Sequence, residues 1–288
     1  MMEYPKAKVE DYGYHDYRKT KKAWHIISSI IVVLVVLMLY LSIIIILIQS
    51  FNSSRLVTEF GDFTFKWYKE MFGDRSLTLA IRNTFIVSIL ATLITTITGT
   101  LIAIGLHYSA PKFCQKILLL NNFPLLNADI VTGISLMLIF SLLLPIFPYI
   151  FGPTTMILAH IFFTLPYMIL SVLPKLRDMD PNMLDAAHDL GLSPGKALIK
   201  VIIPTIKTGI LSGMLFAFTV SFDDFVVSYY TSGNGFDNLS IWIYSSIGRK
   251  SLTPSVYAFS TIITFGTMLI LFGINYYLNK KVKKNETN

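Results

Sequence analysis

The sequence predicts an all-α membrane protein with six transmembrane helices and a helical segment in the cytoplasm. Of its 288 residues, 53% are hydrophobic and 14% are charged, whereas globular domains carry about 25% charged residues. The mean hydropathy is +0.61. A chain of this composition cannot bury its apolar residues in one soluble core, so we expect a bilayer to surround most of it.

Six segments are long enough to cross a bilayer, which takes about 20 apolar residues. The third is unusually polar, because three asparagines, a proline and Asp129 fall within it. The segments cover roughly 26–48, 83–106, 117–140, 154–173, 205–230 and 256–278. We expect a transmembrane domain over 26–278, between cytoplasmic tails at 1–25 and 279–288.

The distribution of basic residues predicts the orientation, because Lys and Arg concentrate on the cytoplasmic side of a membrane protein. With both termini in the cytoplasm, 17 of the 24 basic residues lie inside. The net charge of +7 therefore indicates membrane topology and not a nucleic-acid partner, since these residues flank the apolar runs. The outer segment 63–72 mixes aromatic residues with lysine, which predicts an interfacial helix.

The polar loop 181–204 has the pattern of a capped helix. Asp180 suits the N-cap and Pro181 the first helical position, where a missing N–H costs nothing. Gly191 suits the end of the helix, and a second helix restarts at Ser193-Pro194. Ala186 and its neighbour Ala187 are small enough to let a partner approach. This loop is either a helix that docks into a groove of another protein or a solvated connection between spans.

No catalytic site is predicted. The run from Gly191 to Ala197 has three residues between its glycines instead of four, and Ala follows Lys where a nucleotide-binding loop needs Ser or Thr for magnesium. The five histidines are scattered and form no metal site, and Cys114 stands alone, so no internal disulfide is expected. If the protein works with ATP and magnesium, another polypeptide must hold them.

Three carboxylates fall inside the predicted spans, where each costs about 2.5–3.5 kcal/mol on insertion scales. They are Asp129 in the third span, and Asp223 and Asp224 in the fifth. No Lys or Arg lies in the core of a predicted span to neutralise them, so a cationic substrate could supply the missing charge. Each carboxylate also has an alternative explanation without a ligand. Asp129 could cap a helix break near Pro124, and Asp223 and Asp224 could lie in a water-filled outer vestibule.

Because neighbours on a helix point about 100° apart, Asp223 and Asp224 cannot both face one path squarely. We expect one of them to line the path and the other to hydrogen-bond across a helix interface. Aromatic residues follow the pair, and Tyr229, Trp242 and Tyr244 could hold alkylammonium groups against their faces. The alternative for these three is an aromatic belt at the membrane surface.

The spacing of the 181–204 loop resembles that of importer permeases of the ABC class. Asp185-Ala186-Ala187 is followed by three residues, Gly191, nine residues, Val201 and then Ile203-Pro204; Asp185 stands where that family has Glu. Further stretches resemble the second permease subunit of spermidine/putrescine importers, although Asn127-Ala128 stands where that family commonly has Pro before Asp129. The stretches that resemble this subunit are residues 50–55, 66–68, 129–131, 221–228 and Pro254.

This resemblance implies a permease bundle of the type I importer class in the cytoplasmic membrane, with no enzymatic activity of its own. It implies an ABC ATPase dimer that docks on Asp185, Ala186, Ala187 and Gly191, a second permease, and an extracytoplasmic polyamine-binding protein. ATP and magnesium would belong to the ATPase. Two alternatives stay open: a related importer for an amino acid, iron or thiamine, and a proton-coupled secondary transporter with the buried aspartates as proton sites.

Overall fold

The computed structural model describes residues 14–54, 59–247 and 254–286. Across these ranges the chain is helical, apart from an isolated antiparallel bridge between Asn52 and Phe63. The chain divides into two compact units, one of residues 1–71 with 253–288 and the other of residues 72–252. The all-helical class is therefore confirmed for the described residues.

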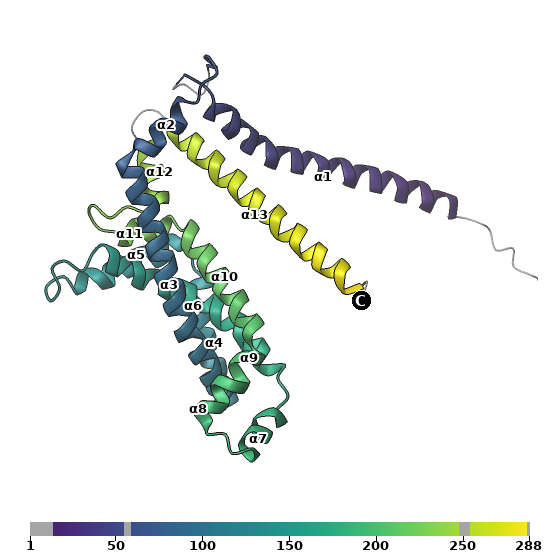
Figure 1. The fold of residues 1–288 in the computed structure, drawn as a ribbon, viewed down its shortest axis with the longest axis vertical. Coiled ribbons are helices and arrows are strands. Elements are labelled where there is room, and N and C mark those ends of the chain that lie inside the picture. The colour runs from purple at the N-terminus through teal and green to yellow at the C-terminus, as the bar shows by residue number, and fades with distance from the viewer. Residues whose placement is uncertain (1–13, 55–58, 248–253, 287–288) are drawn as a thin grey trace, which may run out of the picture. The chain divides into compact units, whose positions relative to one another are not determined.

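The first unit contains two long helices in contact, α1 (Tyr14–Ser50) and α13 (Pro254–Glu286) (Figure 1). The part of α1 from Trp24 to Ser50 is apolar on all sides and almost wholly exposed, as expected for a helix that lies in lipid or against a partner. Residues 14–25, predicted as a tail, belong to α1. Residues 1–13 of that tail lie outside the described residues.

Most of the segment 63–72, for which the sequence predicts an interfacial helix, forms helix α2 (Lys66–Gly73), and one of its aromatic residues is buried. Trp67 is 2% exposed, and its Nε1 donates a hydrogen bond of 2.6 Å to the carbonyl of Asn52. The side chain of Asn52 accepts the amide hydrogens of Ser54 and Gly61. The loop between α1 and α2 is thus held by one buried asparagine.

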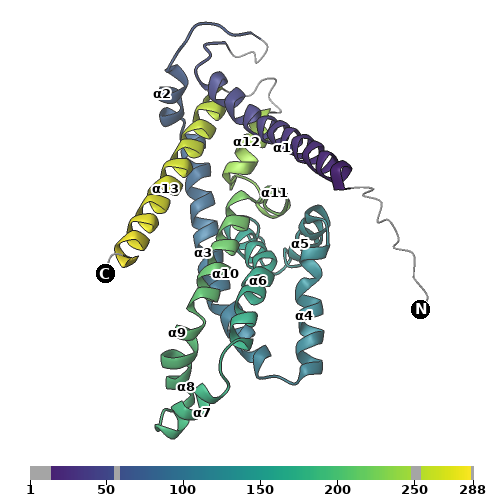
Figure 2. The ribbon, with the colours of Figure 1, turned by 90° about the vertical axis from the view of Figure 1, so that its right-hand side faces the viewer.

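The second unit is a bundle around three long helices, α3 (Arg75–His107), α6 (Pro153–Arg177) and α10 (Lys207–Asp223), which pack along one another. Helices α7, α8 and α9 lie at one end of this unit, and α11 and α12 lie at the other (Figures 1 and 2). The remaining elements are α4 (Pro111–Leu126), α5 (Asp129–Leu142), α7 (Asn182–Asp189), α8 (Pro194–Ala197), a π-helical turn (Leu198–Ile202), α9 (Ile203–Thr205), α11 (Val226–Thr231) and α12 (Leu239–Ile247).

Small residues allow the three central helices to approach closely, as is usual in lipid. A Cβ atom at Gly99 of α3 or at Gly213 of α10 would come within 3 Å of the side chain of Met168 on α6. A Cβ at Gly209 would meet the backbone carbonyl of Ser171 at 2.9 Å. The glycines that the sequence places at i and i+4 on α10 therefore face α6.

Two of the predicted spans are broken, which corrects the sequence analysis. The third turns by 108° between α4 and α5, because Asn127 and Ala128 are extended. The fifth ends as a helix at Asp223, and Asp224 is extended before α11 begins. A second bend, of 72°, separates 194–205 from α10. Local polar residues and prolines therefore override the apolar composition of both segments.

Three described helices are long and apolar enough to cross a membrane, and the number rises to five if each bent pair counts as one span. The three are the 24–50 part of α1, α3 and α6, which match the first, second and fourth predicted spans. The apolar part of α13, Pro254–Leu269, is shorter than these. The structure thus supports a multi-span membrane protein.

Helix α3 begins at a side-chain cap outside the apolar region. The carboxylate of Asp74 accepts hydrogen bonds from the amides of Ser76 and Leu77, at 2.8 and 3.2 Å, and from the Ser76 hydroxyl. Burial alone would raise the pKa of Asp74, but these hydrogen bonds outweigh it and lower the pKa below the ordinary value of 3.8. The ionised cap therefore stabilises the helix.

Replacing Asp74 by Ala is expected to lower the free energy of unfolding at pH 7 by about 1 kcal/mol, the usual cost of a lost N-cap. Since the pKa of the folded state is lowered, the stabilisation is complete above the ordinary pKa and is lost as the pH falls through the lowered one. Unfolding of the detergent-solubilised protein over a pH series measures this. Asp74→Asn keeps a capping oxygen and should lower the free energy of unfolding much less. Equal decreases in the two variants would contradict the capping role of Asp74.

Candidate functional site: an acidic cavity at two helix breaks

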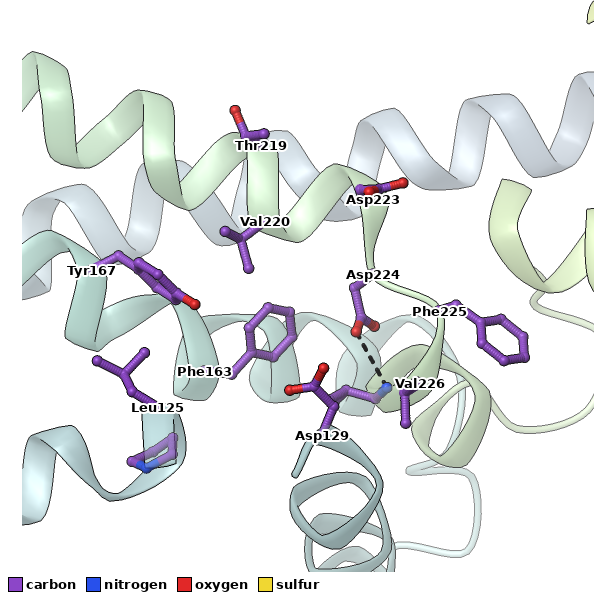
Figure 3. A pocket seen from close by; sticks show the side chains of 12 residues that line it. Leu125, Asp129, Phe163, Tyr167, Thr219, Val220, Asp223, Asp224, Phe225 and Val226 are labelled. Carbon is purple, nitrogen blue, oxygen red and sulfur yellow. Dashed lines mark hydrogen bonds between the residues drawn. The ribbon is translucent and has the colours of Figure 1, made fainter. Parts of the chain in front are cut away.

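A cavity of about 430 Å³ lies in the second unit where the two broken spans meet. Its wall combines the ends of α4 and α10, the starts of α5 and α11, and the middle of α6 (Figure 3). Its lining residues are Pro124, Leu125, Asp129, Phe163, Tyr167, Thr219, Val220, Asp223, Asp224, Phe225, Val226 and Val227. The cavity thus contains all three carboxylates that the sequence places inside spans.

The carboxylates of Asp129 and Asp224 point toward each other across the cavity, while that of Asp223 is directed away from Asp129 (Figure 3). Asp224 is about 10% exposed at its side chain, whereas Asp129 and Asp223 are exposed. Among the described residues that line the cavity, none is Lys, Arg or His. The site therefore concentrates negative charge without a basic residue in its wall.

The break before α11 places the Asp224 carboxylate. Its two oxygens accept the backbone amides of Val227 at 3.3 Å and Ser228 at 2.7 Å, which starts the new helix. The Asn238 side chain donates to the backbone carbonyl of Asp224 at 3.1 Å. Asp223 and Asp224 both line the cavity, but Asp224 is hydrogen-bonded to the start of α11 and Asp223 is exposed. The expected hydrogen bond of one aspartate across a helix interface is not what these contacts form.

The aromatic residues named from the sequence lie outside the wall of the cavity. Tyr229 and Tyr244 are about half exposed. Their ring centroids lie 5.6 and 4.8 Å from that of Phe225, which does line the cavity. Trp242 is 8% exposed, and its Nε1 donates to the Ser76 hydroxyl at 2.8 Å. The structure thus places Trp242 in the packing between α12 and α3.

Sequence reasoning missed the aromatic wall that α6 contributes. Phe163 and Tyr167 lie four residues apart on α6 and both line the cavity, with Tyr167 on the far side of Phe163 from Asp224 (Figure 3). Spacing by four within the fourth span shows that they share a face. Nothing in the sequence indicated that this face meets the aspartates.

The 181–204 segment forms the helical structure that its capping pattern predicts. The Asp180 carboxylate accepts the amide of Asn182 at 2.9 Å at the start of α7, and Gly191 adopts a left-handed φ of +75° after its end. Ser193 precedes α8 as its N-cap. The segment lies at the end of the second unit opposite α12 (Figures 1 and 2).

The α7 residues expected to meet a partner differ in their exposure. Asp185 and Ala186 are exposed, but Ala187 is buried, and Leu184 packs beside the core of the unit. Leu190 is 83% exposed. A partner that docks on α7 would therefore contact Asp185 and Ala186, while Ala187 holds α7 against its own chain.

Comparison with known proteins shows the family. Residues 119–284 match the family described as binding-protein-dependent transport system inner membrane component. The putrescine transport system permease protein PotI of Escherichia coli (strain K12) is 32% identical over 242 residues, which cover 83% of this chain and 85% of the relative. The spermidine/putrescine transport system permease protein PotC of the same organism is 31% identical over 244 residues, 84% of this chain and 89% of that one. This chain belongs to that family of transport permeases.

A solved structure shares the fold. The match is to a crystal structure of a bacterial ABC transporter involved in the import of the acidic polysaccharide alginate, with a TM-score of 0.69 and 14% sequence identity. It covers 93% of this chain and 99% of the other. The resemblance noted from the 181–204 spacing is therefore confirmed at the level of family and fold.

The turn after α7 offers a matched pair of glycine substitutions. A Cβ at Gly191 or at Gly195 would meet no atom within 4 Å, but only Gly191 has a positive φ. We expect Gly191→Ala to destabilise the α7–α8 turn by about 1 kcal/mol, because an L-residue is strained in the left-handed region. Faster hydrogen exchange of the α7 amides would report this. Gly195→Ala should leave the exchange unchanged, and the same acceleration in both variants would contradict the assignment.

Proposed function

We propose that this chain is the transmembrane permease subunit of an ATP-driven, binding-protein-dependent importer of polyamines. The observation that carries the proposal is the acidic cavity, with Asp129, Asp223 and Asp224 in its wall and no basic residue among its described lining. The relatives PotI and PotC are named for the transport of putrescine and of spermidine/putrescine, and these polycations agree with such a cavity.

Charge explains how the cavity would lower the barrier to a polycation. Removing an ammonium group from water is costly, and unit charges about 4 Å apart at an effective dielectric of 20 attract by about 4 kcal/mol. Asp129 and Asp224, which point toward each other (Figure 3), would offset part of this desolvation as the substrate passes. Tight binding would be counterproductive, because the substrate must leave toward the cytoplasm.

Aromatic rings would assist the carboxylates. Phe163, Tyr167 and Phe225 line the same cavity, and each ring can attract an alkylammonium group by about 0.5–2 kcal/mol. Tyr229 and Tyr244, which contact Phe225, would extend this surface away from the wall. Trp242 would contribute by packing alone, because its indole is buried against Ser76.

Transport would be driven from the cytoplasmic face, in a bundle of six spans with both termini inside. An ABC ATPase dimer would bind ATP and magnesium and would contact Asp185 and Ala186 on α7. Ala187 would pack α7 against its own chain, and Gly191 would form the turn that ends it. A second, homologous permease would complete the path, and an extracytoplasmic binding protein would deliver the polyamine. Helix α10 connects the two sites, since the 181–204 segment leads into it and the aspartates lie at its far end.

Replacing Asp224 or Asp129 by Asn is expected to reduce putrescine uptake at least tenfold, since each variant removes one negative charge from the cavity and keeps a side chain of nearly the same size. Uptake of labelled putrescine by cells that express the complete importer measures this, with the assembled complex quantified in parallel. Asp223→Asn should have a smaller effect, because that side chain points away from Asp129.

Asp178→Asn is the matched control, because Asp178 is an exposed carboxylate after α6, outside the cavity, and pairs only with Lys175 at 3.9 Å among the described residues. Its uptake should equal that of the wild type. Normal uptake by the Asp224 and Asp129 variants would remove the counter-ion role. Uptake of an amino acid or iron in place of putrescine would favour a related importer, and uptake without any ATPase would favour a proton-coupled transporter.

A bulky residue at Ala186 is expected to weaken ATPase docking, because Ala186 is exposed on α7. Ala186→Trp should reduce the ATPase that co-purifies with the permease at least fivefold, while the amount of folded permease stays the same. Ala187→Trp should instead reduce the amount of folded permease, since Ala187 is buried in this chain. Unchanged ATPase recovery with Ala186→Trp would contradict docking on this face.

A further inference from the structure

A chain of buried polar side chains lies directly behind Asp224 and joins four elements of the second unit. His160 on α6 is 1% exposed. Its Nδ1 lies 2.7 Å from the hydroxyl of Ser221 on α10, and its Nε2 lies 2.9 Å from the hydroxyl of Ser228 on α11. The Asn238 side chain, at the start of α12, donates to the same Ser228 hydroxyl at 2.8 Å.

The hydrogen bonds of this chain are complete with a neutral imidazole. A neutral histidine has one donor and one acceptor nitrogen, and the two serine hydroxyls can satisfy both in either tautomer. The Nε2 of His160 is 3.7 Å from the nearest Asp224 oxygen, which is too long for a direct hydrogen bond. His160 therefore acts on Asp224 through another residue.

Ser228 is that residue. Its backbone amide makes the shortest hydrogen bond to the Asp224 carboxylate, at 2.7 Å, and its hydroxyl is held by His160 and Asn238. Because Ser228 has no measurable exposure, water does not replace a lost partner readily. The direction of the Asp224 carboxylate thus depends on the position of Ser228, and that position depends on His160.

The same contacts join the two helices on either side of the break. Ser221 lies on the last turn of α10 and Ser228 on the first turn of α11, so the imidazole bridges the two helices across the break. His160 itself is not among the described residues that line the cavity. Phe163, one turn along α6, faces the cavity and contacts the imidazole ring at 5.0 Å between centroids. His160 therefore contacts side chains on both sides of the break and one residue of the cavity wall.

We propose that His160 is a positioning residue for the passage of polyamines: bridged between Ser221 and Ser228, it holds the break between α10 and α11 so that Asp224 presents its carboxylate to the cavity. This inference rests on the proposed function, because it assigns the residue by its effect on the polyamine path. A histidine that only fills the core would give the same contacts but no coupling to the charge of Asp224.

A double-mutant cycle on uptake kinetics separates these two roles. With labelled putrescine and the complete importer, His160→Leu is expected to raise the KM of uptake about fivefold, the size of one lost hydrogen bond. His160→Gln, which keeps one polar contact, should recover part of this. In an Asp224→Asn background, His160→Leu should change the KM less than about twofold, because the charge that it positions is already gone.

Ser228→Ala provides a second variant if His160→Leu does not fold. This substitution removes only the hydroxyl and should raise the KM about threefold. In the Asp224→Asn background, Ser228→Ala should not raise the KM further. Thr95→Val is the matched control, since it removes another buried hydrogen bond of α6, the 3.0 Å contact between the Thr95 and Thr164 hydroxyls. We expect it to leave the KM unchanged.

The outcomes are distinct. Independent effects of His160→Leu and Asp224→Asn that multiply in the double variant would overturn the positioning role while leaving polyamine transport intact. An equal rise of the KM in Thr95→Val would also overturn it, because any loosening of the bundle would then suffice. If the wild-type importer takes up no putrescine, the proposed function fails, and the positioning role fails with it.

Discussion

A helix that breaks inside a bilayer leaves amide and carbonyl groups that lipid cannot satisfy, and the second unit depends on how one such break is closed. After Asp223 the backbone becomes extended for one residue, and the Asp224 carboxylate takes the amides of Val227 and Ser228. Asn238 satisfies the carbonyl of Asp224. One residue therefore satisfies backbone groups at the break and also places one of the three negative charges in the wall of the cavity.

The break also determines what lies at each end of α10. One end continues from the 181–204 segment, and the other end carries the aspartates, at a distance of about 25 Å for 17 residues at 1.5 Å each. The glycines at 209 and 213 bring α10 against α6, where a Cβ atom would meet Met168 and Ser171. Such close packing favours movement of the helix as a rigid body over bending. The proposed coupling between the 181–204 segment and the cavity needs a helix of this kind.

Much of the fold follows from local patterns. Long apolar runs predicted α1, α3 and α6, because a stretch of more than 20 apolar residues has few alternatives to a transmembrane helix. The caps at Asp180 and Gly191 predicted the bounds of α7, since they depend on a few neighbouring residues. The third and fifth spans were predicted as continuous and are broken, because composition averages over a segment and does not register two extended residues such as Asn127 and Ala128.

The sequence by itself determined the class of protein, the helical pattern of 181–204 and the presence of three costly carboxylates, because each depends on composition or on short-range spacing. Only the tertiary structure decided that Asp129 faces Asp224, that Trp242 packs against Ser76 away from the cavity, and that His160 stands behind the acidic wall. These relations join residues tens of positions apart. They depend on how α4, α5 and α10 turn and pack on α6, and no periodicity along the chain records a contact between helices.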